Sequence, residues 1–129
     1  MNNFKYNNES NEASPQIYLD VLSGKCSITG NSYIENARQF YKPVLSWIND
    51  YAQIGSTHQQ TLKWDIKLYY INSTSKKTLV VILKKLSSYQ NKGGKVSINW
   101  HCSPQDNDLL EEITLMAEAS NMTINILDI

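Results

Sequence analysis

Three hydroxyl side chains follow one another in Asn72-Ser73-Thr74-Ser75, a polar segment between an apolar, strand-like run and a run with helical periodicity. Ser, Thr and Asn are the preferred N-cap residues of helices, but one cap needs only one such side chain. A helix N-terminus also carries unpaired N–H groups and a partial positive charge, which suit a phosphate. The spacing alone leaves helix capping and a phosphate-related function equally open.

Two lysines, Lys76 and Lys77, come directly after these hydroxyls and would attract a phosphoryl group. A strand-to-helix loop lies at the carboxyl edge of its strand, which is the usual functional edge of an α/β sheet. Phosphorylation would add a charge of about −1.5 to −2 and change what can dock there. The sequence therefore predicts its functional site at this loop.

A second group of reactive side chains is the pair His101 and Cys102, which would suit a small enzyme as a nucleophile and its base. Alternation along a strand predicts that the two side chains point to opposite faces, which argues against a catalytic pair. His58 lies in a separate segment. The sequence contains no HExxH, GxSxG, CxxC or Gly-rich phosphate loop, so neither catalysis nor a cofactor is expected.

The acidic residues Asp106, Asp108, Glu111 and Glu112 form the one cluster that suggests a cation site. Negative charge is also favourable at a helix N-terminus, by a few tenths to about 1 kcal/mol. We favour this second interpretation and expect no metal.

The composition is that of an ordinary globular domain, with 41% hydrophobic and 19% charged residues in a chain of 129. Twelve basic and twelve acidic side chains cancel, so the charge does not indicate binding to nucleic acid or membranes. Cys26 and Cys102 are far apart, which is not a disulfide framework. The polar N-terminus does not resemble a signal peptide, and no apolar run is as long as a membrane span. We expect a cytoplasmic protein.

Hydrophobic periodicity predicts an α/β domain with the element order β-β-α-β-α-β-α-β over residues 14–129, after a flexible tail at 1–13. A hairpin (strands 16–22 and 25–30) is followed by a helix (31–51), a loop (52–60), a strand (61–71), a helix (76–90), a strand (95–102), a helix (107–120) and a strand (122–129). Alternation of helices and strands after the hairpin predicts a mixed sheet that is parallel in its later part.

Three details of this pattern are specific enough to test. Ser32 and Glu35 have the spacing of a capping box for the first helix. Pro43 lies inside that helix and predicts a kink or a break near Tyr41. In the strand 61–71, the residues expected on the core face are Leu62, Trp64, Ile66, Leu68 and Tyr70.

From Ser14 to its end the chain resembles the SiaC-type regulatory phosphoproteins in three blocks. ITGNSYIENARQFYKPVLSWINDY is similar to the family's Gly-x-Ser-Tyr-Pro-Glu-Asn and Trp-bearing helix. DIKLYYINSTSKKTLVVILKKL is similar to its Tyr-x-Asn-Thr-Ser-Ser-x-Lys. GGKVSINWHCSPQDNDLLEE is similar to its Gly-x-x-Val-x-Val-x-Trp strand and acidic helix start.

The resemblance implies a fold similar to STAS and anti-sigma-factor-antagonist domains, and a partner-switching adaptor. A serine/threonine kinase would phosphorylate the loop, with Ser73 as the acceptor and Thr74 as the alternative. A PP2C-like phosphatase would remove the phosphate. The unphosphorylated form would bind a downstream effector, which is a diguanylate cyclase of cyclic-di-GMP signalling in the best-known system.

The partner-binding rim implied by the same blocks consists of Asn72, Thr74, Ser75 and Lys76, together with Glu35 and Asn36. The chain departs from the family in having Ser73 for Thr, with Thr74 displaced by one, Ile34 for Pro, and Cys102 where an aromatic residue is frequent.

A constitutive binding module without a phospho-switch is the alternative. Its docking surface would be the helix from Ser75 and exposed aromatic residues of the first helix, namely Tyr33, Tyr41 and Trp47.

Overall fold

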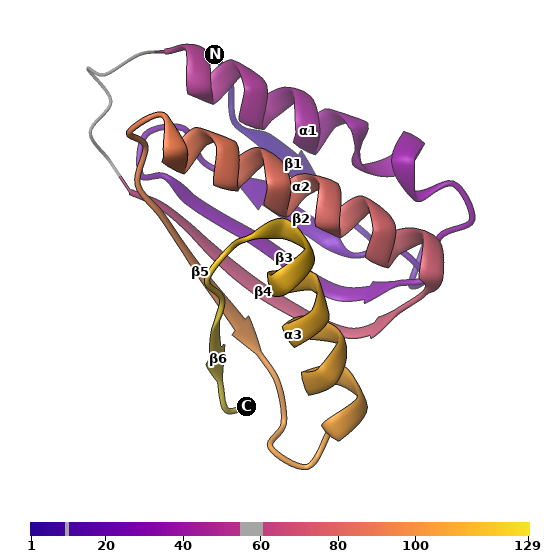
Figure 1. The fold of residues 1–129 in the computed structure, drawn as a ribbon. Helices are drawn as coiled ribbons and strands as arrows, with labels where there is room; N and C mark the ends of the chain where they lie inside the picture. The colour runs from indigo at the N-terminus through magenta and orange to yellow at the C-terminus, as the bar shows by residue number, and fades with distance from the viewer. Residues whose placement is uncertain (10, 55–60) are drawn as a thin grey trace.

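The computed structural model describes residues 1–9, 11–54 and 61–129 of the chain (Figure 1). Within these ranges the elements are β1 (Phe4–Tyr6), β2 (Gln16–Leu19), β3 (Lys25–Ser32), α1 (Ala37–Gln53), β4 (Leu62–Ile71), α2 (Ser73–Asn91), β5 (Val96–His101), α3 (Asn107–Ser120) and β6 (Asn125–Leu127). The predicted α/β class and the predicted element order are confirmed, with one strand added at the N-terminus.

The strands form one sheet in which neighbours in space are neighbours in sequence, β1-β2-β3-β4-β5-β6. β1, β2 and β3 pair antiparallel, and β3 to β6 pair parallel. The hairpin and the later parallel ladder are therefore as predicted. Parallel neighbours require crossover connections, which α1, α2 and α3 supply. No helix within the described residues is long and apolar enough to cross a membrane.

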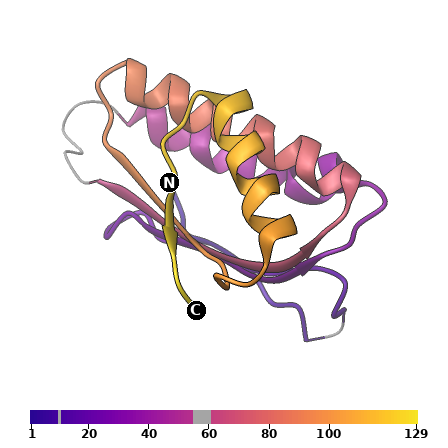
Figure 2. The ribbon, with the colours of Figure 1, turned by 60° about the horizontal axis from the view of Figure 1, so that its bottom comes forward.

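All three helices lie on one face of the sheet, with α2 between α1 and α3 (Figures 1 and 2). β4 alternates accordingly, since Trp64 and Ile66 are buried under the helices while Asp65 and Lys67 are exposed on the other face. Parallel strands are usually covered on both faces. In the part of the chain that the structure describes, no helix covers the other face of the parallel ladder, where the β4 side chains Lys63, Asp65 and Lys67 are exposed.

The N-terminal residues differ from the expected flexible tail, because Phe4–Tyr6 form β1 at the edge of the sheet. The Trp47 indole N–H donates to the Asn2 carbonyl at 3.2 Å. The Tyr6 ring packs edge-on against Phe40 with 5.0 Å between centroids. A strand of three residues in a polar sequence has too short a pattern to be predicted. It is held here by contacts with α1, far away in the sequence.

The start of α1 also differs from the prediction. The N-cap is Asn36, whose side chain accepts a hydrogen bond from the Gln39 amide at 3.2 Å. Ser32 lies in β3, so the predicted capping box of Ser32 and Glu35 is wrong. The helix passes through Pro43 without a break, and two residues of the loop predicted at 52–60 belong to it. Most of that loop, with His58, lies outside the described residues.

The alternation of β4 changes just before the polar loop. Leu68 pairs with Gly30 and Tyr70 with Asn31, so Tyr69 is an extra residue without a partner in β3. This β-bulge turns the Tyr70 side chain outward, where it is 57% exposed, and Ile71 inward. Tyr70 was predicted on the core face, which is wrong because the bulge shifts the alternation by one residue.

Candidate functional site

The polar loop forms the first turn of α2. Asn72 is the N-cap, and its side-chain oxygen accepts from the Ser75 amide at 3.0 Å. The helix therefore begins at Ser73, three residues earlier than predicted, and the hydroxyls occupy its first three positions. Asn72 alone performs the capping, which leaves the three hydroxyls for other roles.

Ser75 points into the protein. Its side chain is fully buried and accepts a hydrogen bond from the Ser32 hydroxyl at 2.7 Å. Ser32 is in turn 2.7 Å from the Tyr41 hydroxyl, which is also fully buried. Burial raises the pKa of Tyr41 to about 12, against the opposing effect of its hydrogen bond to Ser32. This chain of hydroxyls joins β3, α1 and α2, so Ser75 does not belong to an exposed rim.

Thr74 is exposed, but its hydroxyl is engaged. It donates to the Ile34 carbonyl at 2.5 Å and lies 3.3 Å from the Asn72 side-chain oxygen. The side-chain amide of Asn72 also donates to the Ile34 carbonyl, at 2.9 Å. These bonds fasten the segment before α1 to the first turn of α2. Two sequence blocks almost 40 residues apart thus meet at one place.

Ser73 differs from both neighbours. Its side chain is exposed, and within the described residues its hydroxyl makes no hydrogen bond. A modifying enzyme would find this hydroxyl free, without having to break an interaction of the folded protein. Among the three consecutive hydroxyls, that of Ser73 is therefore the most accessible.

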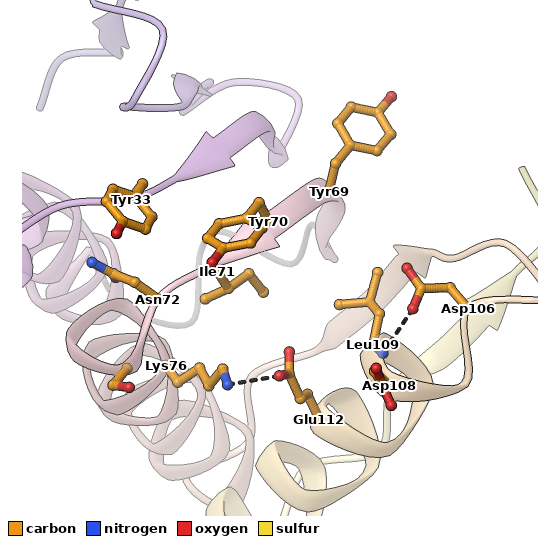
Figure 3. A pocket seen from close by; sticks show the side chains of 11 residues that line it. Tyr33, Tyr69, Tyr70, Ile71, Asn72, Lys76, Asp106, Asp108, Leu109 and Glu112 are labelled. Carbon is orange, nitrogen blue, oxygen red and sulfur yellow. Dashed lines mark hydrogen bonds and ion pairs between the residues drawn. The ribbon is translucent and has the colours of Figure 1, made fainter.

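Ser73 borders a groove of about 500 Å3. Figure 3 shows side chains that line this groove. The groove lies between the end of β4, the start of α2 and the start of α3, and its lining residues are Tyr33, Tyr69, Tyr70, Ile71, Asn72, Ser73, Lys76, Asp106, Asp108, Leu109 and Glu112. The Tyr33 and Tyr70 rings lie 5.4 Å apart on one wall, and the acidic residues of α3 form the other. Exposed tyrosines beside a concave surface are typical of protein-binding sites.

One ion pair joins the two helices across this groove. The Lys76 ammonium lies 2.6 Å from a Glu112 carboxylate oxygen, and each side chain is about one-third exposed (Figure 3). A pair as exposed as this contributes little to stability, about 0–1 kcal/mol. The pair does determine the charge of the groove, because Lys76 is the one cation among the described lining residues and Glu112 neutralises it.

The acidic cluster serves α3 as predicted. Asp106 is the N-cap and accepts from the Leu109 amide at 3.1 Å, and Asp108 lies in the first turn. Within the described ranges no three His, Cys, Asp or Glu side chains are arranged to hold a metal ion.

Glu35 and Asn36 lie on the other side of the first turn of α2. With Thr74 and Lys77 they line a second groove, of about 270 Å3. The predicted rim residues are thus divided between two grooves. Asn72 and Lys76 line the first, beside Ser73, and Glu35, Asn36 and Thr74 line the second.

The aromatic residues proposed for a constitutive docking surface are mostly unavailable. Tyr33 is 60% exposed, but Tyr41 and Trp47 are buried. The prediction for these two residues is wrong, because α1 packs them against the sheet and the N-terminal strand. Sequence reasoning also missed Tyr69, Tyr70 and the acidic side chains as lining residues of the site, since only the bulge and the position of α3 bring them beside Ser73.

His101 and Cys102 do not form a catalytic pair. His101 Nε2 lies 3.2 Å from an Asp65 carboxylate oxygen on the open face of the sheet, whereas the Cys102 side chain is buried. Burial, and then the charges of Asp106 and Asp128, raise the pKa of the Cys102 thiol. A catalytic cysteine requires a lowered pKa, so this environment opposes activation.

We expect both cysteines to react slowly with a thiol reagent at pH 8. Burial raises the pKa of Cys26 as well, so both thiols have a smaller thiolate fraction than a free cysteine at that pH. Reaction with Ellman's reagent should be at least about tenfold slower in the native protein than in urea. Fast reaction of one thiol in the native Cys26→Ala variant would contradict this prediction for Cys102.

The fold and this site define a small α/β protein with an accessible serine at a helix N-terminus, beside a groove suited to a protein partner. Comparison with known families is more specific. The model of the SiaC family regulatory phosphoproteins matches residues 8–129 of the chain. The chain therefore belongs to this family, as its three sequence blocks predicted.

Individual relatives come from Pseudomonas aeruginosa. An uncharacterized protein of that bacterium is 32% identical over 90 residues, which cover 70% of this chain and 69% of the relative. The structure of SiaC from the same bacterium matches with a TM-score of 0.84 and 27% identity over the whole of both chains. A crystal structure of the diguanylate cyclase SiaD in complex with its activator SiaC matches with a TM-score of 0.85 and 25% identity, covering 98% of this chain and 99% of that chain.

Proposed function

We propose that this protein is a phosphorylation-controlled adaptor in bacterial signalling and that Ser73 is its phosphoacceptor. A serine/threonine kinase adds the phosphate and a PP2C-like phosphatase removes it. The unphosphorylated form binds and regulates a downstream effector in the cytoplasm. The effector is a diguanylate cyclase, by analogy with the complex formed by the related SiaC.

We choose Ser73 as the phosphoacceptor because the three neighbouring hydroxyls differ in burial and hydrogen bonding. Ser75 is buried in a hydrogen-bonded chain, and Thr74 donates to the Ile34 carbonyl. Ser73 is exposed, and its hydroxyl has no partner among the described residues. Its position at the start of α2 also suits a dianion, because a helix N-terminus presents free N–H groups and a partial positive charge.

The groove beside Ser73 supports a role in partner switching. It presents the exposed rings of Tyr33 and Tyr70 within reach of the same first turn. Tyrosine is enriched among the residues that dominate binding energy at protein interfaces. A phosphate at Ser73 would place about −1.5 to −2 charges at the rim of that surface. One modification would thus alter the surface on which we expect the effector to dock.

Intact-mass analysis after co-expression with the kinase of its own bacterium tests the proposal. We expect the wild-type protein and Thr74→Ala to gain one phosphoryl group and Ser73→Ala to gain none. A phosphate retained by Ser73→Ala would exclude Ser73 as the acceptor. If neither substitution changed the mass gain, the phosphate would lie outside this loop. If the wild-type protein gained no phosphate, a constitutive binding module would remain.

A further inference from the structure

Lys76 lies where its ammonium group can contact either the Glu112 carboxylate or a phosphate on Ser73. It follows Ser73 by three residues on α2, and side chains at this helical spacing are neighbours, with about 5–6 Å between Cβ atoms. Both residues line the same groove. In the unphosphorylated protein the Lys76 ammonium is occupied by Glu112, at 2.6 Å. Both side chains are partly exposed, so the pair can separate without opening the core.

The charges around the groove make this lysine important for a phosphoryl group. Three lining residues are acidic, Asp106, Asp108 and Glu112, and Lys76 is the one cation among the described lining residues. A phosphate on Ser73 would enter this negative environment with about −1.5 to −2 further charges. At equal distance, a dianion attracts an ammonium group about twice as strongly as a carboxylate does.

We infer that Lys76 reads the phosphorylation state of Ser73 by exchanging partners. In the unphosphorylated protein Lys76 pairs with Glu112 and links α2 to α3. In the phosphorylated protein its ammonium group binds the phosphoryl oxygens. Glu112 is then released as an uncompensated carboxylate on α3, so the modification changes the charge of both walls of the groove. This inference rests on the proposed phosphorylation of Ser73.

Lys77 provides the internal comparison. It carries the same charge on the same turn, four residues after Ser73, but it lines the second groove beside Glu35 and Thr74. If the two lysines only attracted the phosphate by their charge, Lys76 and Lys77 would contribute equally. Partner exchange in the first groove involves Lys76 alone.

The test uses full-length protein in which phosphoserine is incorporated at position 73 during translation, so that no kinase is needed. The second pKa of the phosphate, about 6 for a free phosphoserine, is measured by 31P NMR titration. A bound ammonium group favours the dianion and lowers this pKa. Lys76→Met keeps the apolar stem and removes the charge, so its phosphate should titrate roughly half a unit or more above that of the wild type.

Two further variants complete the measurement. Lys77→Met should raise the phosphate pKa by much less than Lys76→Met does. Glu112→Gln removes the competing carboxylate, so the phosphate should titrate below its wild-type value. Equal pKa values in Lys76→Met and the wild type would overturn the inference, as would an equal rise in Lys77→Met. An unchanged phosphate pKa in Glu112→Gln would show that Glu112 does not compete with the phosphate for Lys76. Failure of a kinase to modify Ser73 would instead contradict the proposed function and leave this titration unaffected.

Discussion

Replacing Ser75 by Asp is expected to lower the free energy of unfolding by about 3–5 kcal/mol, the cost of an uncompensated buried charge. Ser75 is fully buried and its immediate polar partner is the Ser32 hydroxyl, itself bonded to Tyr41. Hydroxyl groups compensate a buried carboxylate poorly. Urea unfolding followed by tryptophan fluorescence measures the loss, because Trp64 and Trp100 are buried in the core.

Ser73→Asp is the matched control. It introduces the same side chain two residues earlier in the same turn, at an exposed position and near the positive end of the helix dipole. Its free energy of unfolding should stay within about 0.5 kcal/mol of the wild type. If Ser75→Asp does not fold, Ser75→Ala should still show a loss of about 1–2 kcal/mol for the broken hydrogen bond. Equal stability of both Ser75 variants and the wild type would contradict the buried hydroxyl chain.

Phosphorylation of Ser73 is expected to weaken binding of the effector at least about tenfold, which corresponds to 1.4 kcal/mol. The added charge of about −1.5 to −2 lies at the rim of the groove that contains Tyr33 and Tyr70. An effector that fits the unphosphorylated groove would have to bury the phosphate dianion, and removing this charge from water costs free energy. Calorimetric titration of the proposed effector, a diguanylate cyclase from the bacterium that makes this protein, with both forms of the protein measures the difference.

Ser88 offers a control on the same helix. It is exposed near the opposite end of α2, so phosphoserine there adds the same charge away from the groove. We expect its affinity for the cyclase to equal that of the unmodified protein. Ser73→Asp should weaken binding less than phosphoserine at position 73, because Asp carries a smaller charge. Unchanged affinity after phosphorylation of Ser73 would favour a constitutive binding module.

Several features of the fold could be predicted because they depend on local patterns. Alternation in β4 and the 3.6-residue period of α2 arise from which side chains must face the core. The hairpin, the parallel ladder and the acidic N-terminus of α3 follow from similar short-range reasoning. β1 could not be predicted, because its three residues are stabilised by α1 and β2 rather than by their own sequence pattern.

The candidate site shows the same division. Sequence by itself determined that a polar segment with three hydroxyls lies between a strand and the apolar face of the next helix, and its three blocks indicated the family. Tertiary structure decided which hydroxyl is available. Ser75 is buried because Ser32 of β3 and Tyr41 of α1 pack against it. The Thr74 hydroxyl already donates a hydrogen bond to the Ile34 carbonyl. The bulge at Tyr69 and the position of α3 build the groove. The physical reason is that accessibility and pairing depend on groups distant in the chain, whereas periodicity records only which side of an element is apolar.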